Sequence, residues 1–162
     1  MEYTGQQFTL DKNSSVLYNH LMNEETLILL RYLIKSGRLA ETSMDSLLSE
    51  AELSATKLLT LRQLDQAERR LSLGQLATCM AFAKSNATQL VDSLESAHLV
   101  KRVPNEDDRR CTGLDLTEEG RKRYEAALRT VQPLVEQLEA LYSPDERRQL
   151  AALLQRLSDA LK

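Results

Sequence analysis

Tryptophan is absent from this 162-residue chain, and only five tyrosines and two phenylalanines supply its aromatic side chains. Glycine (five) and proline (three) are also scarce, so a sandwich or barrel would lack both its turn residues and its usual strand residues. Leucine and alanine dominate the apolar 42% instead. The length and composition favour one mainly helical domain, with or without helical arms.

No apolar run is long enough to cross a bilayer, and residues 1–13 lack the charged start and apolar core of a secretion signal. The two cysteines, Cys79 and Cys111, are too few for a disulfide framework and fit a reducing compartment. We therefore expect a soluble, cytoplasmic protein with no membrane partner.

The chain has no excess of positive charge, since 21 Lys and Arg face 24 Asp and Glu and the net charge is −3. Binding to nucleic acid would have to depend on a few well-placed cations and not on a general basic field. From Gln75 to Gly113 the basic and acidic side chains are equal in number.

Catalytic and metal-binding motifs are also missing. The sequence has no glycine-rich phosphate loop, no nucleophilic serine elbow and no HExxH motif. Its two histidines, His20 and His98, have no Cys or carboxylate at the spacing of metal ligands. We expect no enzyme activity, no metal site and no cofactor.

Apolar residues recur at three- and four-residue steps over most of the chain, which predicts helices separated by capping residues. Between the helices at 84–98 and 117–141, short apolar runs flank a polar loop and predict a two-stranded hairpin over 100–116. Pro133 lies within the helix that Thr117 caps, and Gly37 lies within the first long helix. The expected helices are a short one after residues 13–15, then 24–51, 54–69, 72–80, 84–98, 117–141 and 143–161.

A short helix, a three-residue turn, a longer helix and a charged hairpin form the order of a winged helix-turn-helix. In the longer helix Ala87, Leu90, Val91 and Leu94 form the inward face, so the polar face is free for the major groove of DNA. Asn and Gln can bind adenine edges, Ser and Thr can reach phosphates or bases, and a Lys at the helix start can contact a phosphate. The predicted DNA-binding residues of this helix are Lys84, Ser85, Asn86, Thr88 and Gln89.

The stretch from Leu71 to Gly120, "LSLGQLATCMAFAKSNATQLVDSLESAHLVKRVPNEDDRRCTGLDLTEEG", resembles the core of the MarR family of bacterial transcription regulators. The resemblance covers roughly residues 54 to 142, and its most specific part is Asp108-Arg109-Arg110 followed by LTEEG at 116–120. It implies that Arg110 enters the minor groove and that Asp108 holds the wing in shape. Arg109 and Arg102 would hold flanking phosphates. Ala83 stands where the family usually has a capping Ser or Thr.

The predicted fold is therefore mainly α, of the α+β class, and is a winged helix-turn-helix with a two-stranded β wing and a helical dimerisation region. We expect an N-terminal extension and dimerisation helix (1–53), a DNA-binding lobe (54–118) and C-terminal dimerisation helices (119–162). The resemblance implies a homodimer that binds a pseudo-palindromic double-stranded operator, and that a small aromatic or phenolic effector controls it. We expect a repressor.

Two alternatives stay open at this point. A winged-helix adaptor or antagonist that binds another protein instead of DNA would suit the balanced charge of the core. A thiol sensor of oxidants would depend on Cys111 or Cys79. The arginines beside Cys111 favour its thiolate, whereas Cys79 is expected to be an inert buried thiol.

Overall fold

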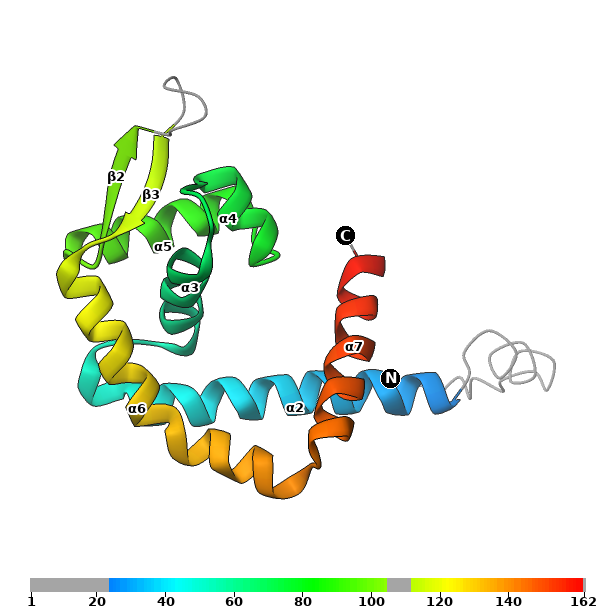
Figure 1. Ribbon diagram of the computed structural model, residues 1–162. Helices are drawn as coiled ribbons and strands as arrows, with labels where there is room; N and C mark the ends of the chain where they lie inside the picture. The colour runs from blue at the N-terminus through cyan, green and yellow to red at the C-terminus, as the bar shows by residue number, and fades with distance from the viewer. Residues whose placement is uncertain (1–23, 105–111, 162) are drawn as a thin grey trace, which may run out of the picture. The chain divides into compact units, whose positions relative to one another are not determined.

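The computed structural model describes residues 24–104 and 112–161 (Figure 1). The short helix expected after residues 13–15 lies outside the described residues. The elements follow one another as α2 (Glu24–Leu48), a single 3₁₀ turn η1 (Ser49–Ala51), α3 (Ala55–Gln66), β1 (Leu71–Ser72), α4 (Leu73–Cys79), α5 (Lys84–Ser96), β2 (Val100–Pro104), β3 (Thr112–Leu116), α6 (Glu118–Leu141) and α7 (Pro144–Ala160).

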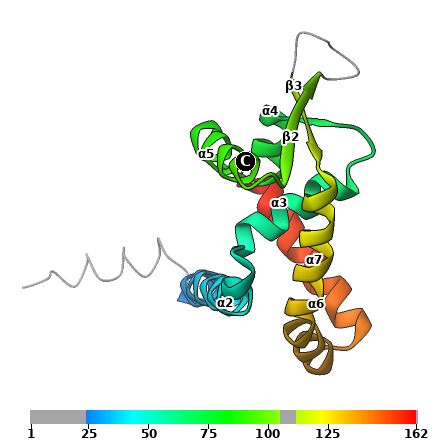
Figure 2. The same ribbon diagram turned by 90° about the vertical axis from the view of Figure 1, so that its left-hand side faces the viewer.

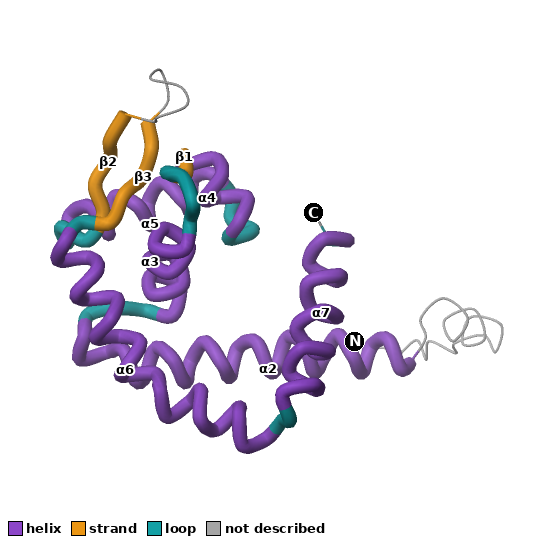
Figure 3. The backbone as a smooth tube through the Cα atoms, in the orientation of Figure 1, coloured by secondary structure: helices purple, strands orange, loops and turns teal. Residues whose placement is uncertain are grey.

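The predicted hairpin is present as β2 and β3, which pair antiparallel from Val100 opposite Leu116 to Pro104 opposite Thr112. A third strand, β1, pairs with the other side of β3, so the sheet order is β1-β3-β2 (Figure 3). The predicted two-stranded wing is therefore confirmed, and β1 adds to its sheet a third strand that the sequence did not predict. Because β1 contains only two residues, it has no alternation of apolar and polar side chains that a sequence could reveal.

Helix starts agree closely with the prediction, since Ser54, Ser72, Thr117 and Ser143 each accept a hydrogen bond from a backbone N–H of the first turn. Helix α2 continues through Gly37 without a break. Helix ends agree less well: α3 ends at Gln66 and α5 at Ser96, each two to three residues early. After α5 the backbone of His98 turns into the left-handed region, with φ of 58°, which stops the helix.

One continuous core is built from buried side chains that come from the end of α2 through the first half of α6. We call residues 48–131 the lobe. Among its fully buried members are Leu48, Leu61, Leu76, Val91 and Leu94. The backbone contacts divide the chain into two units, 1–40 and 41–162. The three-part division at residues 53 and 118 stays a prediction.

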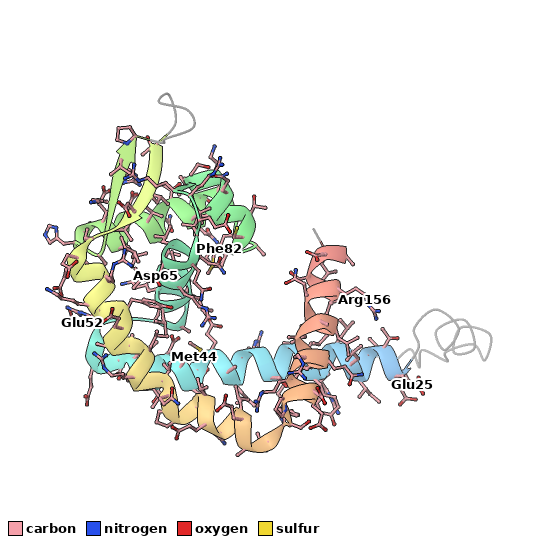
Figure 4. The ribbon with its side chains drawn as sticks, viewed as in Figure 1. Glu25, Met44, Glu52, Asp65, Phe82 and Arg156 are labelled. Carbon is pink, nitrogen blue, oxygen red and sulfur yellow. The ribbon has the colours of Figure 1, made fainter. Side chains whose placement is uncertain are left out.

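Polar contacts fix the start of α6 to the lobe. Arg121 donates a hydrogen bond to Asp65 of α3 at 2.6 Å, with Asp65 labelled on α3 in Figure 4. Arg123 donates to the backbone carbonyl of Ala51 at 2.9 Å. These bonds join the helix that follows the wing to the helices that precede it.

Gly120 is required by a close approach of backbone to backbone. A Cβ at this position would lie 1.9 Å from the carbonyl oxygen of Leu99, much too close for any real contact. The same oxygen accepts a hydrogen bond from the N–H of Thr117 at 3.1 Å, and Thr117 Oγ1 also donates to the carbonyl of His98 at 2.6 Å. The LTEEG stretch thus docks the start of α6 on the chain that leaves α5.

Outside the lobe the apolar side chains are mostly exposed. Helix α7 has no buried residue, and Leu48 is the only buried residue of α2. We call residues 24–40 and 134–161 the arms. None of the described helices combines the length and apolar content needed to cross a membrane. The large apolar side chains exposed in the arms are Leu27, Ile28, Leu29, Leu30, Tyr32, Ile34, Leu39, Val135, Leu138, Leu141, Tyr142, Leu150, Leu153, Leu154 and Leu161.

Candidate nucleic-acid interface

Helix α4 supplies the support on which the candidate interface rests. Ser72 and Gln75 form a capping box, with the Ser72 N–H donating to Gln75 at 2.8 Å and the Gln75 N–H to Ser72 at 3.3 Å. Leu76 and Ala77 are buried, so this seven-residue helix is fixed at its start and along one face. It gives α5 a rigid surface to pack against.

The turn between α4 and α5 is closed by backbone hydrogen bonds, from Ala81 N–H to Thr78 at 3.2 Å and from Phe82 N–H to Ala77 at 2.9 Å. Ala81 has a φ of 53°, in the left-handed region where a side chain costs about 1 kcal/mol or more. Phe82 lies in this turn (Figure 4). The turn thus sets the direction of α5 despite some strain.

Helix α5 has the two faces that the sequence predicted. Ala87, Val91 and Leu94 are buried, and four of the five predicted contact residues, Lys84, Ser85, Asn86 and Gln89, are exposed on the other side. Thr88, the fifth, is half-buried, and its hydroxyl donates to the carbonyl of Lys84 at 2.9 Å. As expected, Ala83 provides no side-chain cap. The N–H groups in the first turn of α5 therefore bond to no capping side chain and can donate to another acceptor.

Arg102 does not stand alone at the base of the wing. Its guanidinium donates to Asp92 at 2.6 Å and also to Glu95, both of which lie on α5. Figure 2 shows α5 beside β2, the strand that carries Arg102. The hydrogen bond to Asp92 is the main reason that the pKa of Arg102 is raised above its ordinary value. The guanidinium of Arg102 therefore stays protonated.

A second group of charges lies on the sheet. Asp115 of β3 is 3.7 Å from the ammonium of Lys101 and 3.9 Å from the guanidinium of Arg70. All three side chains are at least one-third exposed, so these pairs contribute little to stability. They do offset the charge of Asp115 on the wing strands.

The predicted wing residues Asp108, Arg109 and Arg110, and the candidate thiol Cys111, lie outside the described residues. The paired ends of β2 and β3, at Pro104 and Thr112, are described and flank them on both sides. Their roles therefore stay predictions.

One site residue differs from its prediction, and two were missed. Cys79 is exposed and not buried, because a seven-residue helix buries only the arc around Leu76 and Ala77, and Cys79 lies on another side. The partners of Arg102 were missed, although Asp92 and Glu95 stand three residues apart, a spacing that places both on one side of a helix. Within residues 24–104 and 112–161, no three His, Cys, Asp or Glu side chains come together as metal ligands.

Comparison with known proteins connects this arrangement to one family. The MarR family model matches residues 53–112, which include α3, α4, α5 and β2 and end at the first residue of β3. The HTH-type transcriptional regulator PecS of Dickeya dadantii (strain 3937) is 30% identical over 146 residues, which cover 86% of this chain and 86% of PecS. The transcriptional regulator BldR from Sulfolobus solfataricus has a crystal structure that matches with a TM-score of 0.72 at 27% identity, over 85% of this chain and 99% of BldR.

Two structures of CouR match at lower identity and share the fold. The repressor CouR bound to a 23-mer DNA duplex has a TM-score of 0.70 at 24% identity, over 85% of this chain and 97% of CouR. CouR from Rhodococcus jostii RHA1 bound to p-coumaroyl-CoA has a TM-score of 0.72 at 22% identity, over 84% of this chain and 92% of CouR.

Proposed function

The chain belongs to the MarR family of DNA-binding transcription regulators, and from that membership we propose that it is a dimeric, sequence-specific repressor controlled by a small molecule. Its relatives are regulators, so the chain is not an enzyme. The proposal concerns the DNA contacts, the dimer and the ligand.

The division of α5 into two faces is the observation that carries the proposal. Its buried residues fix the helix on the lobe, while Asn86 and Gln89 are exposed on the opposite side. Amide side chains are suited to bidentate hydrogen bonds with adenine, so these two residues read base edges in the major groove. Lys84 and Ser85, in the first turn, hold phosphates.

The wing adds contacts in the minor groove. Arg110 enters the groove, Asp108 orients it, and Arg109 binds a flanking phosphate. A narrow minor groove concentrates negative potential, so a single inserted arginine binds more strongly there than at an open phosphate. The support is the hairpin itself, whose described strands pair in register up to residues 104 and 112.

A homodimer would cover the apolar side chains of the arms. The exposed leucines between Leu138 and Leu161 have 43–78% of their surface accessible in the single chain, which is much more than a soluble helix usually leaves uncovered. A two-fold dimer carries two copies of α5 about one DNA turn apart, so its operator is a pseudo-palindrome.

The proposed ligand is a small aromatic or phenolic molecule. The support is the ligand of CouR together with an open groove of about 440 Å³ between the end of α2 and the middle of α6. That volume lies in the usual range of small-molecule sites. A ligand in this groove changes the affinity for DNA by changing the separation of the two α5 helices of the dimer. The groove is lined by Thr42, Ser43, Ser46, Leu47, Pro133, Leu134 and Gln137.

The proposal is tested by selecting bound duplexes from a random library and then titrating the selected duplex and a random duplex at several salt concentrations. We expect a pseudo-palindromic sequence, and affinity for both duplexes that falls steeply with salt. Binding without sequence preference would remove the claim of specificity. No binding to either duplex would remove the claim of DNA binding altogether.

The second candidate function is a protein-binding adaptor. The observation that favours it is the acidic pair Asp92 and Glu95 on the face of α5 that would lie near DNA. An adaptor would bind no duplex at low salt, whereas the repressor binds random duplex even without its operator. The same titration therefore separates the two.

A further inference from the structure

Three charged side chains join strand β2 of the wing to helix α5. Arg102 of β2 uses one terminal nitrogen for Asp92, at 2.6 Å, and the other for Glu95. Both carboxylates are on α5, three residues apart. The exposed fractions of the three side chains are 34% for Arg102, 56% for Asp92 and 38% for Glu95. The group therefore lies at the protein surface, within the candidate nucleic-acid interface.

This arrangement affects what Arg102 can do for DNA. A guanidinium binds a phosphate best with two parallel N–H groups, and both terminal nitrogens of Arg102 already serve carboxylates. The two carboxylates, in turn, would repel the phosphates that approach α5, and Arg102 offsets one of their two charges. The arginine is thus placed to act on DNA binding through its neighbours.

We propose that Arg102 is a positioning residue for DNA binding, which holds β2 against α5 and shields Asp92 and Glu95, and that it does not itself contact a phosphate. This inference rests on the proposed function. It replaces the expectation from the sequence that Arg102 holds a flanking phosphate. It also explains how an acidic pair can be tolerated on a helix that faces DNA.

The test is a double-mutant cycle that measures affinity for one duplex at one salt concentration. The four proteins are the parent, Arg102→Ala, Asp92→Asn with Glu95→Gln, and the triple variant. We expect Arg102→Ala to weaken binding about tenfold in the parent, because it leaves two carboxylates unshielded, but less than about threefold when both are already neutral. Removal of the carboxylates thus rescues the loss of the arginine.

A phosphate contact predicts a different pattern. Arg102→Ala would then weaken binding by the same factor in both backgrounds, and that result would overturn the inference. No loss in the parent background would overturn it equally. A parent that binds no duplex would overturn the proposed function and this inference together, so the two failures are distinguishable.

Lys101→Ala is the matched control. Lys101 lies next to Arg102 on β2, but its partner is Asp115 of the sheet and not a residue of α5. Its removal should change affinity by the same factor in both backgrounds. Arg102→Lys adds a second measurement, since an ammonium keeps the charge but cannot serve two carboxylates as a planar fork. We expect its affinity between those of the parent and Arg102→Ala, and affinity below Arg102→Ala would contradict the inference.

Discussion

Helices α5 and α7 are both amphipathic, yet they differ in what the single chain does with their apolar faces. Helix α5, with 13 residues, buries Ala87, Val91 and Leu94 in the lobe. Helix α7, with 17 residues, buries none. The lobe therefore completes its core within one chain. The arms leave apolar surface exposed, and we propose that a second chain covers it. Under the proposed function, recognition of DNA belongs to the first region and assembly to the second.

The largest expected effect comes from charging the apolar face of α7. Leu150→Glu with Leu154→Glu places two carboxylates where the proposed dimer has apolar contacts, so we expect monomer or aggregate in sedimentation experiments. A monomer can bind only one half-site of the operator. Loss of the contact with the second half-site should weaken operator binding about 100-fold or more.

Ala152→Glu is the control for this prediction, because Ala152 lies on the opposite side of α7. It should leave the dimer and its affinity unchanged. A double Leu variant that still sediments as a dimer and binds the operator normally would show that α7 takes no part in assembly.

Gly120→Ala tests the claim that the lobe is complete in one chain. The new methyl group would meet the backbone of Leu99, which cannot move aside as a flexible side chain can. We expect the free energy of unfolding to fall by about 3 kcal/mol, at the upper end of the range for overpacking. The loss should appear in denaturant titrations at any protein concentration.

Gly74→Ala is its control, since nothing lies within 4 Å of a Cβ at that position. Alanine is the better helix former, so stability should stay the same or rise by up to about 1 kcal/mol. Equal losses for the two variants would mean that the clash at Leu99 is not the cause.

Ala81→Gly should raise the stability of the lobe slightly. Glycine adopts a φ of 53° without steric cost, which removes about 1 kcal/mol of strain, and part of this gain is lost to the greater freedom of the unfolded chain. We expect a net gain of about 0.5 kcal/mol. Ala77→Gly, inside α4, should lower stability instead, because its backbone is helical and glycine is the poorer helix former. The same sign for both variants would contradict the strain at Ala81.

The smallest effect concerns the start of α7 and is visible only as a function of pH. Hydrogen bonds from the hydroxyl and the N–H of Ser143 lower the pKa of Glu146 below its ordinary value. A lowered folded pKa means that the cap is complete above the ordinary pKa of Glu, about 4.3, and is lost as the pH falls through the folded pKa. The amide signal of Ser143 in NMR spectra should follow this titration and stay constant in Glu146→Gln. A midpoint at or above the ordinary value would contradict it.

Much of the fold followed from short-range signals in the sequence. Caps at Ser72, Thr117 and Ser143 depend on residues three positions apart, so the sequence alone places them. Strand β1 was missed because two residues carry no period, and its pairing with β3 depends on residues more than 40 positions away. Burial of Cys79 was predicted wrongly because helical period gives the direction of a side chain but not how far the core extends.

The candidate site shows the same limit. The exposed positions of α5 follow from its period, and the structure agrees with the prediction at Lys84, Asn86 and Gln89. The pairing of Arg102 with Asp92 could not be derived, since it requires β2 to lie beside α5. Local sequence gives the faces of helices, and tertiary structure decides which charges meet.

The most direct test of the account is a competition titration of Asn86→Ala on the selected operator and on random duplex. If α5 reads base edges, the variant should lose roughly 1–3 kcal/mol on the operator, while its affinity for random duplex stays within about threefold of the parent. Ser96→Ala, at the other end of α5, should change neither affinity. Equal losses on both duplexes, or no loss on either, would contradict the claim that the exposed face of α5 recognises the sequence of DNA.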